Sequence, residues 1–360
     1  PVSKQVRIPL VITGSADTLD YSITLDTVII DADDSVGSVV ITALVDSLVE
    51  SNEKIIIRAV DVQNASDTVK QVLELIITED VCDFIETDIR GNITEDLTLY
   101  NLCNPYTIIG DLIVANGATL TIEPGVQIEF EGPYSITVID GAKLMSLGSE
   151  QDSITISGIS WKGIDIKSPG SMIQYTRIIE EGNSSQGDYL LKLTGSHVDK
   201  SHIYGGTKGI QLNDSSIVSR SKIHDIRNEA IQLYQRSVAY GNIIYDIGTD
   251  MNYDGAVQTY DRSYFLNNKV YSTLDDPNMI AVAAQSSGVI AGNTIGSDKG
   301  IHGKFGIYVR EGGQVEVVGN RIGGFNTNVV LIGTRPEFKD NTFMGELDSE
   351  SKQMNVRVAS

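Results

Sequence analysis

Apolar and polar residues alternate in short phrases over residues 209–344. One phrase places a polar residue between two apolar ones, as in Ile210-Gln211-Leu212, Ile231-Gln232-Leu233 and Ile307-Tyr308-Val309. A period of two puts both apolar side chains on the same face of a strand, whereas a helix needs apolar positions three and four residues apart. The pattern therefore predicts short strands whose apolar residues face inward and whose middle residue faces outward.

The phrase repeats along the chain. Its first apolar residue recurs at intervals of 21, 26, 23, 27 and 23 residues, at Ile210, Ile231, Val257, Ile280, Ile307 and Val330. A second phrase keeps step with the first and begins at Asn242, Asn268, Asn293, Asn320 and Asn341, with Thr176, Ser201 and Ser221 at the matching positions upstream. Two phrases that share one period are typical of a solenoid of stacked coils. The asparagines predict a ladder of hydrogen-bonded amides at a bend, and the alternative is a set of surface turns.

Residues 105–180 contain phrases such as Gly117-Ala118-Thr119-Leu120-Thr121-Ile122-Glu123-Pro124-Gly125 and Trp161-Lys162-Gly163-Ile164. These phrases resemble the opening coils of bacterial secreted right-handed parallel β-helix proteins, and the resemblance extends to about Met344. It implies a solenoid over 105–360, with a polar C-terminal segment, 346–360, as its cap. The architecture hosts lyases, epimerases, hydrolases and adhesins, so the resemblance implies a fold and no single activity.

Residues 1–80 lack the solenoid phrase and contain alternating strands separated by turn residues, a pattern typical of a small antiparallel sandwich. The stretch from Val45 to Glu53, together with Gly14-Ser15-Ala16 and the strand from Leu73 to Thr78, resembles the Calx-β family. The resemblance implies an immunoglobulin-like sandwich. The fold class predicted for the whole chain is therefore all-β, with this sandwich followed by the right-handed parallel β-helix.

Calx-β domains can gather calcium with acidic loop residues, because carboxylate oxygens suit this hard cation. The residues that the resemblance assigns to such a site are Asp20, Asp46, Glu50, Glu53 and Asp80. Residues 1–80 contain fourteen acidic and five basic side chains, a net charge of −9. Calcium is thus a candidate cofactor, and the alternative is a sandwich with solvated surface acids.

Residues 81–104 form the expected junction between the two domains, and they contain both cysteines of the chain, Cys82 and Cys103. A pair of cysteines flanking a domain boundary favours a disulfide in an exported protein, and the alternative is two free thiols.

The chain of 360 residues has a net charge of −21 and a pI of about 4.5. This acidity argues against nucleic acid as a partner, because phosphate binding requires a basic surface.

No apolar run reaches the length of a membrane span. The chain begins at Pro1 without a signal peptide, which suggests a processed product. We expect an extracellular or bacterial cell-surface protein that is a monomer.

The outward positions of the second phrase form two parallel columns, and successive residues within each column lie one coil apart. The first contains the basic residues Arg177, His202, Lys222 and Lys269, and the second contains Tyr204, His224, Tyr245 and Tyr271. Aromatic rings pack against sugar rings, and basic groups hold acidic substituents. These eight residues are the candidate carbohydrate-binding site, and the alternative is a purely structural stripe.

A second polar face is predicted at Lys192, Gln211, Gln232, Gln258, Ala281 and Tyr308. Beside it lie two similar segments, Tyr234-Gln235-Arg236-Ser237 and Tyr260-Asp261-Arg262-Ser263. The sequence contains no phosphate loop, nucleophile elbow or dinucleotide fingerprint, and its four histidines lack metal-ligand spacing.

The preferred hypothesis is a protein that binds a polysaccharide or surface glycan. One alternative is a polysaccharide lyase or epimerase acting on an acidic glycan, with His224, Tyr245, Lys222 and Arg177 as base and charge neutralisers. Asp225 and Asp246, which follow the aromatic column, are a weaker candidate pair for glycoside hydrolysis. The other alternative is a structural spacer.

Overall fold

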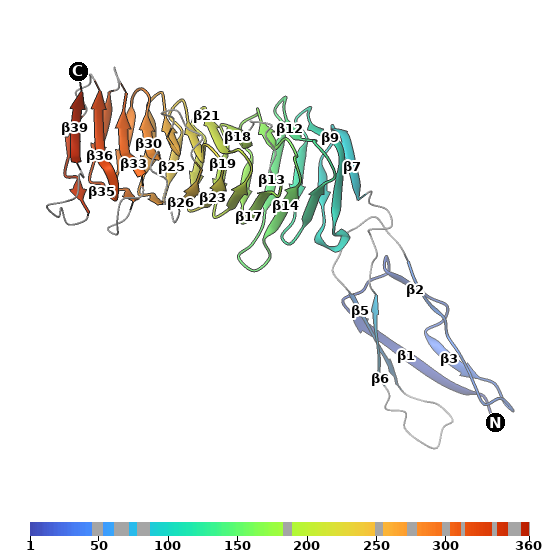
Figure 1. Cartoon of the computed structure of the whole chain (residues 1–360). Helices are drawn as coiled ribbons and strands as arrows, with labels where there is room; N and C mark the ends of the chain where they lie inside the picture. Colours follow the sequence, from blue (N-terminus) through green and yellow to red (C-terminus); the bar gives the residue numbers. More distant parts are fainter. Residues whose placement is uncertain are drawn as a thin grey trace. The chain divides into compact units, whose positions relative to one another are not determined.

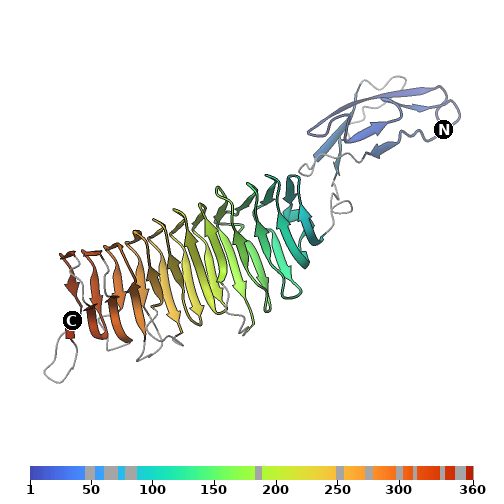
Figure 2. The same ribbon diagram turned by 90° about the horizontal axis from the view of Figure 1, so that it is seen from above.

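A computed structural model gives the arrangement of the chain (Figures 1 and 2). It describes residues 1–44, 53–60, 72–77, 87–182, 189–248, 255–271, 279–296, 303–310, 314–332, 337–344 and 354–359. The chain divides into two compact units, Pro1–Glu86 and Thr87–Ser360. Apart from one short 3-10 helix, η2 (Asn101–Cys103), the described elements are strands, and none of the described segments forms a helix of the length and hydropathy needed to cross a membrane.

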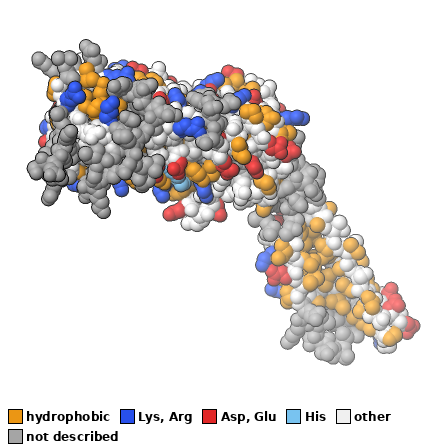
Figure 3. Space-filling view, in the orientation of Figure 1, with side chains coloured by type: hydrophobic (Ala, Val, Ile, Leu, Met, Phe, Trp, Pro, Cys, Tyr) orange, Lys and Arg blue, Asp and Glu red, His pale blue; other side chains and the backbone are white. Residues whose placement is uncertain are grey.

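The first unit contains two antiparallel sheets. One has the order β3-β1-β5-β6 and the other pairs β2 with β4. The bounds of these strands are β1 (Val6–Gly14), β2 (Tyr21–Ile23), β3 (Thr27–Ile30), β4 (Ile41–Ala43), β5 (Glu53–Ala59) and β6 (Val72–Ile77). In β5 the alternation predicted from sequence is visible, because Ile55 and Ile57 are buried while Arg58 is exposed. Hydrophobic side chains remain visible on the surface of this unit in Figure 3.

The second unit is a parallel solenoid with three strands in a regular coil, which confirms the predicted fold class. Face 1 consists of β8 (Leu97–Leu99), β10 (Thr119–Ile122), β13 (Lys143–Leu147), β16 (Met172–Gln174), β19 (His197–Asp199), β22 (Ile217–Ser219), β25 (Val238–Tyr240), β28 (Ser263–Leu266), β31 (Gly288–Ala291), β34 (Val315–Val318) and β37 (Glu337–Lys339). Face 2 consists of β11 (Gln127–Phe130), β14 (Ile154–Gly158), β17 (Thr176–Glu180), β20 (His202–Gly205), β23 (Lys222–Ile226), β26 (Ile243–Ile247), β29 (Lys269–Tyr271), β32 (Thr294–Gly296), β35 (Arg321–Gly323) and β38 (Thr342–Phe343). Face 3 consists of β12 (Ile136–Val138), β15 (Ile164–Ile166), β18 (Tyr189–Thr194), β21 (Lys208–Asn213), β24 (Ile231–Leu233), β27 (Val257–Thr259), β30 (Ile280–Ala284), β33 (Gly303–Val309), β36 (Phe325–Ile332) and β39 (Met354–Ala359). Crossovers between parallel strands of one sheet are almost always right-handed, which is the hand that the sequence resemblance implies.

The solenoid begins earlier than residue 105. Strands β7 (Asp88–Ile93) and β9 (Tyr106–Val114) pair in parallel with each other, and β8 pairs with β10 of face 1. The stretch expected to be a junction therefore contains the first solenoid strands. The sequence pattern obscures this because β7 carries a register shift between Ile89 and Gly91, which interrupts the period of two. At the other end, β39 pairs with β36, while residues 346–353 and 360 of the expected cap lie outside the described part of the chain.

The solenoid core consists of the inward-facing columns of apolar residues. Ile210 pairs with Ile231, Leu212 pairs with Leu233, and all four side chains are fully buried. Stacking of coils removes these side chains from water, which stabilises the solenoid by a free energy of about 25 cal/mol per Å² of apolar surface buried. This burial is the main contribution that holds one coil on the next.

The predicted amide ladder is present at the corner between faces 1 and 2. Asn242 Nδ2 donates to Asn268 Oδ1 at 2.9 Å, and the same contact continues from Asn268 to Asn293 at 3.2 Å and from Asn293 to Asn320 at 2.9 Å. Upstream, the backbone N–H of Ser221 donates to Asn242 Oδ1 at 2.9 Å, and that of Ser201 donates to Ser221 Oγ at 3.0 Å. The ladder satisfies polar groups that the bend would otherwise bury without partners.

Two phrases of face 3 were placed in the wrong register by sequence. Val257 pairs with Val282 and not with Ile280, so the outward position after Gln258 belongs to Ala283 and not to Ala281. Ile307 pairs with Val329, which moves Val330 to the outward position beside Tyr308. The runs Ile280–Ala284 and Val329–Ile332 are apolar at every position, so alternation could not fix their register.

Candidate functional site

The two columns predicted on face 2 are in register in the structure. Arg177 pairs with His202, which pairs with Lys222, and the column continues through Ile243 to Lys269. The neighbouring column runs from Ile179 through Tyr204, His224 and Tyr245 to Tyr271. All eight candidate residues therefore lie together on five successive strands, β17 to β29.

The aromatic rings of face 2 stack on one another along the solenoid. The Tyr204 and His224 ring centroids lie 5.0 Å apart with planes 6° from parallel, and the His224 and Tyr245 centroids lie 4.5 Å apart at 12°. Tyr245 and Tyr271 continue the stack at 5.3 Å and 8°. The stack follows from the coil spacing, because neighbouring parallel strands lie about 4.8 Å apart.

This stacking changes the way in which face 2 can contact a ligand. His224 lies between Tyr204 and Tyr245, and Tyr245 lies between His224 and Tyr271, so both faces of these two rings are covered. A sugar ring cannot pack on them as the sequence analysis expected. The hydroxyl groups of the half-buried Tyr245 and Tyr271 remain as hydrogen-bonding partners for a ligand, whereas both ring nitrogens of the buried His224 already have partners within the protein.

The basic side chains of face 2 are exposed. Arg177, Lys222 and Lys269 are all exposed, the Arg177 guanidinium donates to the Tyr204 hydroxyl at 3.0 Å, and Lys269 Nζ lies 4.7 Å from the centre of the Tyr271 ring. Among the described residues, Lys222 forms no ion pair. Basic, acidic and histidine side chains lie side by side along the lower edge of the solenoid in Figure 3.

His202 and His224 form a pair inside this positive strip. Their Nε2 atoms are in hydrogen-bond contact, and His224 Nδ1 lies 2.6 Å from Asp225 Oδ2. Burial, together with the charges of His224, Lys222 and Arg177, lowers the pKa of His202 to about 4, and Asp225 opposes the shift. Burial and the neighbours Tyr271, Asp225 and Asp246 raise the pKa of Tyr245, so this phenol keeps its proton as a hydrogen-bond donor.

The outward column of face 3 forms a second ladder of amides. Gln211 Nε2 donates to Gln232 Oε1 at 3.1 Å, and Gln232 Nε2 donates to Gln258 Oε1 at 3.3 Å. Ala283 follows at the next position, so the amide nitrogen of the buried Gln258 has no hydrogen-bond partner among the described atoms. The Tyr234 and Tyr260 rings stack beside this ladder with centroids 4.5 Å apart.

A polar cleft of about 790 Å³ lies at the corner where face 3 turns into face 1. Its lining includes Asn213, Asp214, Gln235, Arg236, Asp261 and Arg262. The cleft thus includes the two similar segments that the sequence placed beside the second polar face, but sequence alone gave no indication of a hollow there.

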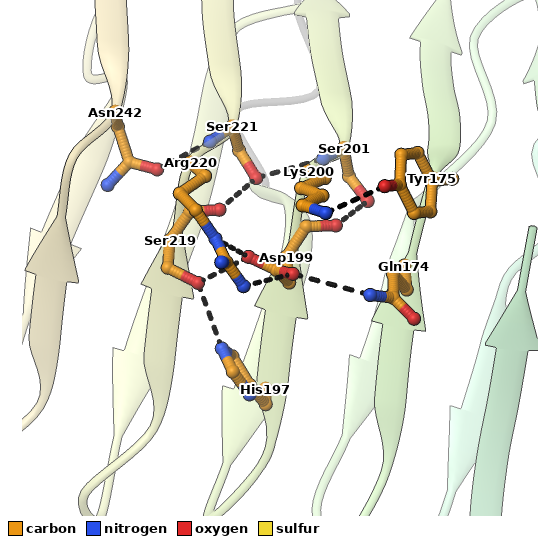
Figure 4. Close-up of polar contacts among 10 residues, drawn as sticks. All are labelled: Gln174, Tyr175, His197, Asp199, Lys200, Ser201, Ser219, Arg220, Ser221 and Asn242. Carbon is orange, nitrogen blue, oxygen red and sulfur yellow. Dashed lines mark hydrogen bonds and ion pairs between the residues drawn. The ribbon is translucent and has the colours of Figure 1, made fainter. Parts of the chain in front are cut away.

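The structure also contains a buried polar network that sequence reasoning missed (Figure 4). Asp199 is 1% exposed and accepts two hydrogen bonds from Arg220, at 2.8 and 2.6 Å, and one from Ser219 Oγ at 2.7 Å. Burial alone would raise the pKa of Asp199, but the Arg220 and Ser219 hydrogen bonds and the Arg220 charge together lower it. Asp199 of β19 pairs with Ser219 of β22, so a correct alignment of these two strands would have predicted that Asp199, Ser219 and the adjacent Arg220 lie close together.

The same network brings a histidine, a serine and an aspartate together, yet the order of contacts differs from that of a catalytic triad. His197 Nε2 lies 3.0 Å from Ser219 Oγ, but the Ser219 hydroxyl donates to Asp199, and Asp199 is paired with Arg220. Burial lowers the pKa of His197, and the charge of Asp199 opposes this shift. Among the described residues, no carboxylate is hydrogen-bonded to the His197 imidazole as a triad requires, whereas the hydrogen bonds of Asp199 link neighbouring coils at this corner.

A second buried group of titratable residues lies at the start of face 3. The Tyr189 hydroxyl donates to Glu229, Lys208 Nζ lies 3.3 Å from Glu229 Oε2, and both Tyr189 and Glu229 are buried. Burial and the hydrogen bond to Glu229 raise the pKa of Tyr189. The buried Glu229 carboxylate thus contacts both a cation and a hydrogen-bond donor, and these contacts link its coil to those of β18 and β21.

The candidate calcium ligands are only partly within the described residues. Asp46, Glu50 and Asp80 lie outside them, Asp20 is 3% exposed, and Glu53 is half-buried in β5. Within the described part of the chain, no three acidic, histidine or cysteine side chains gather in a metal-binding arrangement.

The expected disulfide lies at the start of the solenoid. Cys103 is buried at the end of η2 and is not a free thiol. Cys82 lies outside the described residues, so its pairing with Cys103 stays a prediction.

Comparisons with known proteins return only distant similarity. No family model and no curated protein matches the chain, so the Calx-β resemblance of residues 1–80 rests on its sequence motifs alone. A double mutant of the periplasmic alginate epimerase AlgG matches 74% of this chain and 73% of its own, at 13% identity and a TM-score of 0.30. Tailspike protein 3 of bacteriophage CBA120 matches 75% of this chain and 51% of its own, at 8% identity and a TM-score of 0.32. Neither similarity is high enough to carry an argument about function.

Proposed function

We propose that the solenoid binds an extended acidic polysaccharide along face 2, as a secreted or bacterial cell-surface carbohydrate-binding protein. One observation carries the proposal. On a chain of net charge −21, the cations Arg177, Lys222 and Lys269 share one column, with His202 and Ile243 at its other positions, beside a continuous stack of aromatic rings. Scattered basic residues would be ordinary on such a surface, whereas a column aligns the positive charges along one line that crosses the coils.

The spacing of the column suits a linear polymer. Adjacent coils are about 4.8 Å apart, and sugar residues of an extended glycan advance by roughly the same distance. Acid groups of the glycan would pair with Arg177, Lys222 and Lys269, which are exposed. Its hydroxyls would bond with the edges of the ring stack, at Tyr245 and Tyr271.

The affinity that this surface can supply is modest. An exposed ion pair contributes about 0.2–1 kcal/mol, and ordering a flexible glycan costs entropy. Several such pairs along the column together give specificity for a charged polymer. Binding should therefore weaken as salt rises, because added ions screen exposed charges beyond about 10 Å at 0.1 M.

Calorimetric titration with uronate-containing and neutral oligosaccharides tests the proposal. We expect Lys222→Ala to weaken uronate binding by about twofold to fivefold and to reduce its salt dependence. Lys143→Ala is the matched control, because Lys143 is an exposed lysine on face 1. If no oligosaccharide binds, or if the two lysine variants lose the same affinity, the ring stack and its basic column are structural and the spacer hypothesis replaces this one.

A second candidate function is a lyase or epimerase acting on the same acidic glycan. The contact of His224 Nδ1 with Asp225 Oδ2 at 2.6 Å, one coil from the protonated phenol of Tyr245, favours it, since proton abstraction requires an oriented base and an acid. Incubation with a polyuronate, followed by assays for unsaturated products and for exchange of the C5 proton, decides it. Activity that disappears in Tyr245→Phe supports an enzyme, and absence of both products in the wild-type protein contradicts one.

A further inference from the structure

The corner between faces 3 and 1 carries an unusual backbone. Over three successive coils the turn consists of two non-glycine residues with positive φ, at Asp214 and Ser215, Gln235 and Arg236, and Asp261 and Arg262, with φ values of 49° to 64°. The left-handed region disfavours side chains that carry a Cβ, and such strain gathers where function requires it. Glycine would suit these turns better, yet all six positions carry polar or charged side chains.

Hydrogen bonds between coils hold these turns in place. The backbone N–H of Arg236 donates to the Asp261 carbonyl at 3.1 Å, and that of Arg262 donates to the Ser287 carbonyl at 2.8 Å. The backbone N–H of Asp261 also donates to Ser286 Oγ at 2.8 Å. These hydrogen bonds fix the backbone of the turns, so Arg236 and Arg262 lie at matching positions one coil apart.

The two arginines are not neutralised. Both are exposed, and neither forms an ion pair with a residue in the described part of the chain, although Asp214 and Asp261 line the same cleft. The two turns lie on neighbouring coils, whose backbones are about 4.8 Å apart, so the like charges repel each other and a shared anion stabilises the arrangement. A guanidinium fork binds carboxylate or sulfate through two parallel hydrogen bonds.

The acids and amides of the cleft add a second requirement for the ligand. Asp214 and Asp261 offer carboxylate oxygens that accept hydrogen bonds from hydroxyls, and Asn213 and Gln235 offer both donors and acceptors. A simple inorganic anion would use the arginines and be repelled by the acids. A ligand with one acid group and several hydroxyls uses all of them.

We infer that this corner cleft binds a single acidic sugar residue, with its carboxylate on Arg236 and Arg262 and its hydroxyls on Asp214 and Asp261. The cleft volume of about 790 Å³ accommodates such a unit. The site lies on another corner of the solenoid and does not depend on the proposed binding of a polymer along face 2.

Ligand-observed NMR titration with sodium glucuronate, glucose and sodium sulfate tests the inference. We expect saturable binding of glucuronate, with glucose and sulfate each at least tenfold weaker, because either lacks half of the complementary groups. Equal binding of sulfate would overturn the inference in favour of an adventitious ion only. Absence of glucuronate binding would overturn it outright.

The double variant Arg236→Gly/Arg262→Gly separates binding from folding. Glycine relieves the left-handed strain, so we expect a Tm equal to or above that of the wild type together with a loss of glucuronate affinity of tenfold or more. Unchanged glucuronate binding in this variant would sink the assignment. Lys143→Ala, which removes an exposed lysine of face 1, should bind glucuronate as the wild type does. A loss in Lys143→Ala as large as in the double variant would show that binding follows total charge and would overturn the assignment.

Discussion

Buried polar side chains at the corners of this solenoid stabilise it by pairing backbone groups that would otherwise lack a hydrogen-bond partner. Asn268 is 2% exposed; its Nδ2 reaches the Ala239 carbonyl at 2.9 Å and its Oδ1 accepts from the backbone N–H of Asn242 at 2.9 Å. The asparagine thus satisfies backbone groups of two coils at once. Its value lies in avoiding the cost of burying those groups unpartnered, which is larger than the net gain of a single hydrogen bond.

Asn268→Ala should therefore destabilise the solenoid by about 2–4 kcal/mol, because it leaves buried backbone groups without partners. Asn268→Ser should cost less, since serine holds the equivalent positions at Ser201 and Ser221. Urea denaturation followed by circular dichroism measures the difference. The exposed Asn92 is the control position, and a midpoint for Asn268→Ala equal to that of Asn92→Ala would contradict the ladder's role.

His202 makes stability depend on pH in a defined direction. Its pKa is lowered in the folded protein from 6.5 to about 4, so the unfolded chain binds more protons between these values. Stability should consequently fall as the pH decreases from about 6.5 towards 4. His202→Gln should show a smaller fall, with a remainder from His197, whose pKa is also lowered. Thermal melts at pH 7 and pH 4.5 compare the two proteins, and an equal loss of Tm in both would refute the assignment.

At the scale of elements, the sequence was sufficient where polar and apolar residues alternate. The columns Arg177–Lys269 and Tyr204–Tyr271 and the asparagine ladder were all predicted, because each strand of face 2 carries one unambiguous inward residue such as Ile203 or Ile223. Register failed in β30 and β36, whose runs Ile280–Ala284 and Val329–Ile332 are apolar on both sides. Nothing in alternation distinguishes a slip of one or two residues there.

The sequence was sufficient to predict which residues share a column on face 2, but not how their side chains are oriented. The sequence placed Tyr204, His224 and Tyr245 in one column, but only the structure gives their ring planes, which show that the faces of His224 are covered by its neighbours. The Asp199–Arg220 pair and the corner cleft were missed for a related reason. Their residues lie in corners, where no period governs the direction of a side chain.

The start of the solenoid should depend on a disulfide between Cys82 and Cys103. The bridge would close a loop of about 20 residues around β7 and β8, which stabilises by about 3 kcal/mol through the unfolded state. Mass spectrometry after alkylation without reductant should find no modified cysteine in protein from an oxidising compartment. Two alkylated thiols would exclude the bridge, and Cys103→Ser provides the matched stability measurement.

At the scale of the whole molecule, charge is distributed unevenly. The chain carries −21 overall and residues 1–80 carry −9, from fourteen acidic and five basic residues, while face 2 presents its basic column. If an acidic glycan binds face 2 as proposed, such a distribution of charge repels it from the acidic surfaces and attracts it to the basic column. The charge distribution would then contribute orientation and selectivity more than affinity.

The acidic first unit carries the calcium prediction. A cation held by Asp20, Asp46, Glu50, Glu53 and Asp80 would relieve repulsion among them, so binding should raise the Tm of this unit by linkage. Differential scanning calorimetry with calcium or with chelator compares the wild type with Glu50→Ala. A shift in the wild type that is absent in the variant supports the site, and identical behaviour of the two proteins removes it.

The central claim is that an acidic glycan lies along face 2, one sugar for each coil, and the dependence of affinity on glycan length tests it most directly. Calorimetric titration with a series of oligouronates should show affinity that increases with each added residue until the column from Arg177 to Lys269 is covered, at five strands, and then levels off. Lys222→Ala should lower affinity only for oligomers long enough to cross β23. Affinity that is already maximal for a disaccharide, or that is insensitive to Lys222→Ala at every length, would contradict the claim.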